Sequence, residues 1–173
     1  PKKSRIARWK AMQAVKSADL VTGTTDFMVS YVIEHFNAPG IKTRRSSWGI
    51  DTENFRPSSQ DAVRALRQRL GIPDDAPVIV SNRNMKPHYR IDALMHSVPI
   101  VLRKYPSVRY VFFRGYGLVS YENELKKLAK RLDLLRNIIF VPDFISSQEM
   151  AVYCTMATAC VSVPLTDQFG YSI

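Results

Sequence analysis

Residues 81–90 follow an apolar run and place Arg83, Lys86 and Arg90 in one short connection. Guanidinium and ammonium groups in such a loop can bind a diphosphate, together with the partial positive charge at the start of a following helix. This spacing indicates an anion site. The alternative is a solvated basic loop that binds nothing.

Residues 114–117 contain Gly115 and Gly117 directly after another apolar run. Glycine accepts a left-handed backbone and lets a ligand approach the main chain closely. The same pattern is typical of a plain turn, so on its own it is a weak indication of a binding loop.

Residues 164–171 place Asp167, Phe169 and Gly170 just before an expected helix. Free amides at a helix start bind phosphate oxygens, and the Asp167 carboxylate can accept hydrogen bonds from sugar hydroxyls. Taken alone, Asp167 is equally well explained as a helix cap.

The segments that must position these loops alternate between two patterns. A capping-box-like Ser58-x-x-Asp61 leads into a predicted helix over 61–70, which Gly71 can end in a left-handed conformation. Apolar β-type runs are then separated by helical patterns. The predicted strands are 78–81, 108–113, 138–141 and 159–163, and the predicted helices between them are 91–103, 121–132 and 147–156.

This alternation predicts an α/β fold, a Rossmann-like parallel sheet with helices on both faces. Ligands of such sheets bind at the carboxyl ends of the strands, where all three loops are expected to lie.

The first part of the chain has its own pattern. A helix is predicted over 4–17, a short strand over 18–22 and a helix from Thr24 or Thr25 through Phe36. Residues 41–47 are extended by position but unusually polar. Turn residues and a proline in 48–57 are typical of a connector, so we expect 1–47 and 58–173 to belong to different domains.

Composition limits the functional classes. The chain has 46% hydrophobic residues and a formal net charge of +10, which favours a globular protein with a nucleic acid, an anionic membrane surface or a phosphorylated small molecule as partner. No zinc-finger or RNA-binding motif accompanies the charge, and Cys154 and Cys160 lack the spacing of a zinc site. Every apolar run is far shorter than a membrane span, so we expect a cytoplasmic protein.

Several motifs together resemble the GT-B glycosyltransferases of the retaining family 4 type. The stretch ADLVTGTT (18–25) is similar to the strand that closes the family's amino-terminal domain, and WGID with FRP (48–57) is similar to its interdomain connector. SNR with YRID (81–92) resembles the "GR…KG-apolar-D" loop. The remaining matches, in the family's order, are YP with GYG (105–117), IFVPDF (139–144) and VPLTDQFG (163–170).

The resemblance implies roles for individual residues. Arg83 matches the arginine that holds the donor diphosphate, and the amides near Phe169 and Gly170 match those that bind the same group. Asp167 stands at the first glutamate of the family's E-x7-E motif, which contacts the donor sugar. The glycines of GYG belong to the same donor-binding set, and the family needs no metal or other cofactor.

The chain departs from the family pattern at two places. Tyr89 occupies the usual position of a phosphate-binding lysine, so that charge comes from Lys86 or Arg90 or is absent. The second glutamate of E-x7-E would fall beyond Ile173. We therefore expect 58–173 to be an incomplete donor domain after the end of an acceptor-side domain, and the isolated chain to be inactive.

The predicted function is transfer of a sugar from a nucleoside-diphosphate sugar to a glycan or lipid-linked acceptor with retention, in polysaccharide biosynthesis. A cytoplasmic enzyme with peripheral contact at the inner face of an anionic membrane fits this function, and nucleic acid is not an expected partner. The alternatives are a sugar-nucleotide epimerase on the same scaffold and a non-catalytic basic α/β module that binds anionic membrane or nucleic acid.

Overall fold

A computed structural model describes residues 2–165 and 167, and the chain forms two compact units, Pro1–Ile50 and Asp51–Ile173. The division falls within residues 48–57, the predicted connector. Each unit is described by itself below. None of the helices in the described part of the chain is long and apolar enough to span a membrane.

The first unit contains two helices and a pair of parallel strands. Thr25 caps the second helix, because its Oγ1 accepts a hydrogen bond from the amide of Met28 at 3.1 Å, and Asn37 ends that helix in a left-handed conformation with φ 54°. The polar stretch 41–47 contains a 3-10 turn and a short strand. The elements are α1 (Lys2–Ser17), β1 (Val21–Gly23), α2 (Asp26–Phe36), η1 (Gly40–Lys42) and β2 (Thr43–Arg45).

The second unit is built on a four-stranded sheet in which every pairing is parallel. Its strands are β3 (Val78–Asn84), β4 (Arg109–Phe113), β5 (Ile138–Val141) and β6 (Ala159–Cys160), in the order β5-β4-β3-β6. The predicted parallel sheet is therefore confirmed.

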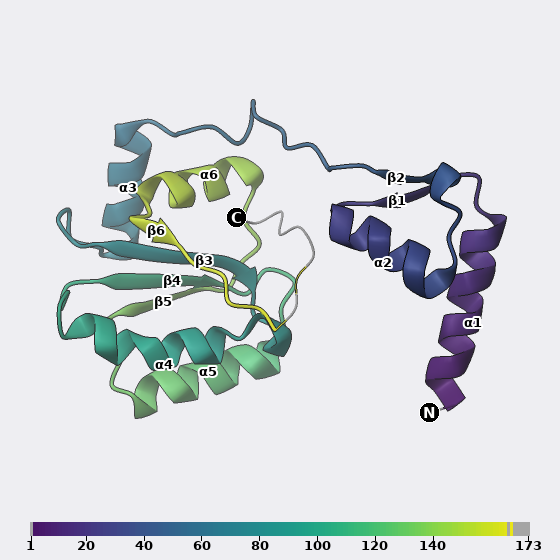
Figure 1. The fold of residues 1–173 in the computed structure, drawn as a ribbon. Helices are drawn as coiled ribbons and strands as arrows, with labels where there is room; N and C mark the ends of the chain where they lie inside the picture. The colour runs from purple at the N-terminus through teal and green to yellow at the C-terminus, as the bar shows by residue number, and fades with distance from the viewer. Residues whose placement is uncertain (1, 166, 168–173) are drawn as a thin grey trace. The chain divides into compact units, whose positions relative to one another are not determined.

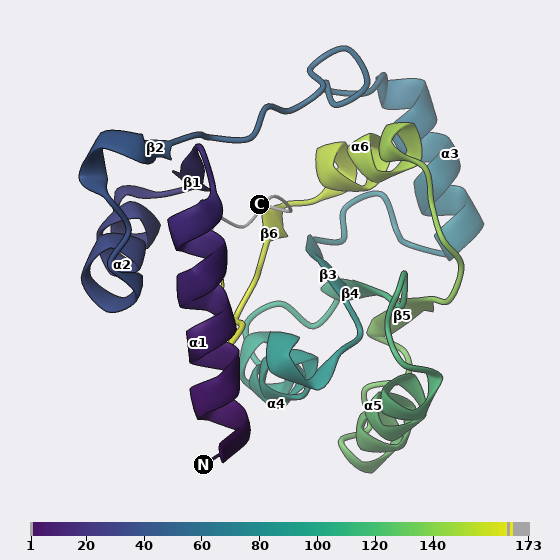
Figure 2. The same cartoon turned by 90° about the vertical axis from the view of Figure 1, so that its right-hand side faces the viewer.

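Helices cover both faces of this sheet (Figures 1 and 2). One face packs against α3 (Gln60–Leu70) and α6 (Ser147–Met156), and the other against α4 (Ile91–Leu102) and α5 (Val119–Arg131). The central strand β4 supplies both cores in alternation, because successive side chains of a strand point to opposite faces. Tyr110 and Phe112 lie in one core, and Val111 and Phe113 in the other.

The C-terminal end of α3 was predicted correctly, whereas its N-terminal capping residue was not. Gly71 ends the helix in the predicted left-handed conformation, with φ 63°. The capping serine, however, is Ser59 and not Ser58, because Ser59 Oγ accepts from the amide of Ala62 at 3.3 Å. The Ser58 amide donates instead to Thr155 Oγ1 at 3.0 Å. Ser59 is the residue directly before α3, and Ser58 lies one residue outside the cap, where its amide contacts α6.

The order in which the chain adds strands to the sheet reverses between β3 and β6. From β3 it steps to β4 and β5 on one side, and α6 then carries it back to the other side of β3. In open α/β sheets such a reversal leaves a crevice at the carboxyl ends of the two strands that flank it. The carboxyl ends of β3 and β6 are therefore the first place to look for a site.

Candidate functional site

Arg83 lies at this reversal point with its side chain only 6% exposed. Its Nε donates to Ser162 Oγ at 2.7 Å, and its Nη2 forms an ion pair with Asp167. A buried guanidinium is stable only when partners replace its lost hydration. Here both partners come from the segment after β6, so chain segments far apart in sequence meet at the predicted crevice.

A bulge in β3 positions Arg83. Ser81 pairs with Phe112, but the next pairing joins Asn84 to Phe113, so Asn82 and Arg83 interrupt the regular register. The sequence-based prediction placed Arg83 in a loop after a strand that ended at Ser81. The strand instead continues to Asn84. Bulges often re-aim a side chain beside a binding site, and this bulge carries the arginine.

The next residues form a short turn against Arg83. The 3-10 turn η2 (Pro87–Tyr89) brings the Tyr89 ring under the guanidinium, with Arg83 Cζ 5.1 Å from the ring centroid. Lys86 precedes the turn and is half-buried, whereas Arg90 follows it, is exposed and has a left-handed φ of 53°. In the described part of the chain, Lys86 and Arg90 flank the turn without joining the contacts of the Arg83 side chain.

Ser162 was missed as a site residue because the prediction included it in a strand over 159–163. That strand is shorter, since β6 pairs with β3 only at Ala159 and Cys160. The amide of Val161 still donates to the carbonyl of Val80 at 2.9 Å, after which the chain leaves the sheet toward Arg83. Nothing in the local sequence distinguishes Ser162 from its neighbours. Phe169 and Gly170 lie outside the described residues.

The glycine loop after β4 packs on the end of β3. The amide of Tyr116 donates to Asn84 Oδ1 at 3.2 Å, and the amide of Leu118 donates to the carbonyl of Met85 at 2.9 Å. Gly115 has φ 48°, and a Cβ on Gly117 would lie 2.6 Å from the Met85 carbonyl oxygen. The close approach that Gly117 allows is therefore to the protein's own backbone, and the one that Gly115 allows is to the side chain of Asn84.

We expect Gly117→Ala to lower the free energy of unfolding by about 1–3 kcal/mol, because the added methyl overlaps rigid backbone atoms on both sides. Chemical denaturation of the wild type and the variant measures this change in the free energy of unfolding. Gly49→Ala is the control, since its Cβ would meet open space and should change stability by less than about 0.5 kcal/mol. Equal stability of both variants would contradict the packing role of Gly117.

A buried ion cluster anchors the same loop and was not predicted. Glu122 on α5 has a side chain 2% exposed and contacts Arg114 Nη1 at 3.2 Å and Lys126 Nζ at 2.7 Å. Burial alone would raise the pKa of the Glu122 carboxyl, but Lys126 and Arg114 outweigh it and hold the pKa below its ordinary value. The i,i+4 spacing of Glu122 and Lys126 is the one sequence signal of this cluster.

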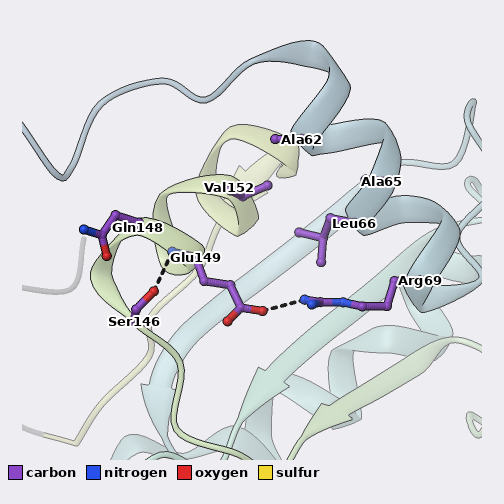
Figure 3. Close-up of a pocket in the computed structure, with 8 residues that line it drawn as sticks. All are labelled: Ala62, Ala65, Leu66, Arg69, Ser146, Gln148, Glu149 and Val152. Atoms are coloured by element: carbon purple, nitrogen blue, oxygen red, sulfur yellow. Dashed lines mark hydrogen bonds and ion pairs between the residues drawn. The ribbon is translucent and has the colours of Figure 1, made fainter.

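A groove lies on the helical layer and not at the strand ends. This groove of about 510 Å³ runs between α3 and α6, with Ala62, Ala65, Leu66 and Val152 among its apolar lining. Figure 3 shows Arg69 and Glu149 meeting across it in an ion pair. None of the predicted site residues lines this groove. Among the described residues, no cluster of histidine, cysteine and acidic side chains could hold a metal ion.

Comparison with known proteins gives two kinds of relative, although no family model matches the sequence. A D-inositol 3-phosphate glycosyltransferase of Nocardioides sp. is 28% identical over 171 residues, covering 91% of this chain and 36% of the relative. One from Streptomyces avermitilis is 28% identical over 166 residues, covering 92% of this chain and 35% of the relative. The chain therefore spans about a third of the length of these relatives.

Solved structures show the same fold. Sucrose-phosphate synthase from Thermosynechococcus elongatus superposes with a TM-score of 0.80 at 21% identity, covering 96% of this chain and 40% of that one. HepE of Anabaena in complex with UDP-glucose has a TM-score of 0.78 at 18% identity, covering 98% and 46%. These likenesses confirm the predicted Rossmann-like α/β fold.

Proposed function

We propose that this chain belongs to a retaining GT-B glycosyltransferase of the family 4 type and forms most of its donor-binding domain. In the complete enzyme, a sugar passes from a nucleoside-diphosphate sugar to a glycan or lipid-linked acceptor. Residues 1–47 are then the end of the acceptor-side domain, 48–57 the connector and 58–173 the donor domain.

The single observation that carries this proposal is the buried Arg83 at the carboxyl end of β3, held by Ser162 and Asp167 at the reversal point of a parallel sheet. A cation at this position is well placed for an anionic ligand. Two of the five N–H groups of the guanidinium are used by Ser162 and Asp167. The other N–H groups are the donors that we assign to the diphosphate.

The chemistry of glycosyl transfer suits such a site. As the bond between the anomeric carbon and the diphosphate oxygen breaks, negative charge grows on the leaving diphosphate. A preorganised guanidinium stabilises that charge more strongly in the transition state than in the ground state, which accelerates the reaction. Asp167, adjacent to Arg83, is then placed where the sugar joins the diphosphate, and its carboxylate can accept hydrogen bonds from sugar hydroxyls.

The relatives support the same class of reaction. The sequence relatives are named as inositol phosphate glycosyltransferases, and one solved neighbour is described as a complex with UDP-glucose. We infer from these names that a nucleotide sugar is the donor. Neither an epimerase nor a nucleic-acid-binding module is named among the relatives cited above.

The test is made on the complete protein, with UDP- and GDP-sugars supplied in turn. We expect one sugar nucleotide to raise its melting temperature and to lose its sugar to an acceptor, as followed by release of the nucleoside diphosphate. A polyanion such as heparin is the control for nonspecific charge. Salt-sensitive binding of heparin, with no effect of any sugar nucleotide on the melting temperature, would contradict the proposal. It would favour the alternative of a non-catalytic basic α/β module.

A further inference from the structure

Tyr89 is the clearest difference between this site and the family pattern, because a phosphate-binding lysine is expected at its position. Its ring faces the buried guanidinium of Arg83, with 5.1 Å between Arg83 Cζ and the ring centroid. A guanidinium over an aromatic face is attracted by the ring quadrupole, and the attraction is stronger where water is excluded. The position therefore holds a neutral ring where a second cation was expected.

Backbone hydrogen bonds fix the turn that carries Tyr89, and the ring of His88 lies beside the Tyr89 ring. The Tyr89 amide donates to the Lys86 carbonyl at 3.0 Å, and the His88 ring lies 3.9 Å from the Tyr89 ring, centroid to centroid. The amide of Leu165 donates to the His88 carbonyl at 2.9 Å, which ties the turn to the segment that carries Asp167. The turn is thus bound to the segment after β6, which carries both Ser162 and Asp167.

The three contacts restrain Arg83 in different directions. Ser162 and Asp167 hold one edge of the planar guanidinium, and Tyr89 holds one of its faces. A planar group with an edge and a face held has little freedom to tilt, so its remaining N–H groups keep one direction. Preorganised donors of this kind need no reorientation when charge develops on a ligand.

We propose that Tyr89 is a positioning residue that orients Arg83 toward the leaving diphosphate, so that this loop binds the diphosphate through one oriented guanidinium and not through a pair of cations. The inference rests on the proposed function, because it assumes that Arg83 contacts the diphosphate. It adds that the ring face of Tyr89, and neither its hydroxyl nor a charge at its position, sets the strength of that contact.

The experiment compares Tyr89→Phe, Tyr89→Leu and Tyr89→Lys in the complete enzyme. Affinity for UDP and GDP is measured by calorimetry. The value of kcat/KM is measured separately with the matching sugar nucleotide. Tyr89→Phe keeps the ring and should stay within about twofold of the wild type. Tyr89→Leu should weaken diphosphate affinity by about 5- to 30-fold, which corresponds to ~1–2 kcal/mol. Tyr89→Lys should also weaken it, because an added ammonium repels the guanidinium.

Two controls separate orientation from general damage. Tyr105→Leu removes an exposed ring that faces Lys104 at 5.4 Å, an otherwise similar pair outside the site, and should leave affinity unchanged. In an Arg83→Ala background, Tyr89→Leu should have no further effect on diphosphate affinity, since there is no guanidinium left to orient. Unfolding midpoints of all variants show whether each one folds.

The outcomes distinguish the two proposals. If the wild type binds no nucleoside diphosphate, the proposed function fails and this inference fails with it. If the wild type binds and Arg83→Ala binds more weakly, but Tyr89→Leu equals the wild type, only the inference about Tyr89 is overturned. Tighter binding by Tyr89→Lys would overturn it too, because the position would then act through charge. A loss in Tyr89→Leu that persists unchanged without Arg83 would mean a role independent of the guanidinium.

Discussion

Arg83→Ala is expected to lower kcat/KM of the complete enzyme by about 10²–10³-fold. The guanidinium makes a charge-assisted contact to the leaving diphosphate that is strongest in the transition state, and its removal is worth ~2–4 kcal/mol. Because the side chain is buried and held by Ser162, Asp167 and Tyr89, no neighbouring cation can move into its place without rearranging the site. Steady-state kinetics with the sugar nucleotide measure the loss.

Arg64→Ala is the matched control for this prediction. Arg64 lies on α3, its side chain is 61% exposed, and it pairs with Asp61 within the same helix. An exposed ion pair of this kind contributes little to stability, and Arg64 lies outside the strand-end site. We expect its removal to leave kcat/KM unchanged. A similar fall in both variants would show that Arg83 acts through overall charge and not through a phosphate contact.

Asp167→Asn is expected to lower kcat/KM by about 10–100-fold while affinity for the free nucleoside diphosphate stays within a few-fold of the wild type. Hydrogen bonds from sugar hydroxyls to a carboxylate are stronger than those to a neutral amide. The substitution therefore lowers kcat/KM with the intact sugar nucleotide, which carries those hydroxyls. The free diphosphate is affected less, because removing a carboxylate beside Arg83 also removes a like charge near the phosphates.

The contact with Arg83 adds a stability effect to the same substitution. Asp167 is the ionic partner of a buried guanidinium, although its own side chain is 27% exposed, so we expect the free energy of unfolding to fall by about 1–3 kcal/mol. Asp61→Asn, in the exposed pair with Arg64, should change neither property. If Asp167 is only a helix cap, the substitution should leave kcat/KM unchanged, because asparagine caps as well as aspartate. An unchanged kcat/KM in Asp167→Asn would therefore reject the sugar contact.

Local pattern was sufficient for most of the architecture. The helix 147–156 and the strand 138–141 were predicted with the bounds that the structure has, because apolar periodicity and turn residues are properties of adjacent sequence. Gly71 was correctly identified as a helix end for the same reason, since a left-handed cap needs a residue that tolerates positive φ.

The errors lie where a distant segment decides the local structure. Ser59 and not Ser58 caps α3, and the amide of Ser58 instead donates to Thr155 on α6. The strand over 159–163 is short because the chain turns away after Cys160, and β3 runs past Ser81 through a bulge. None of these outcomes follows from neighbouring residues, since each depends on a partner segment whose position is set by the packed sheet.

The sequence by itself determined the alternation of strands and helices, and it indicated that cations, glycines and an acidic residue lie toward the carboxyl ends of the strands. Only the tertiary structure decided that β6 lies beside β3, that Ser162 and Asp167 reach Arg83, and that Tyr89 faces the guanidinium. The physical reason is that periodicity and capping act within a few residues. The polar partners of the buried Arg83, Ser162 and Asp167, are chosen by how whole strands pack, and these two contacts join residues about eighty positions apart.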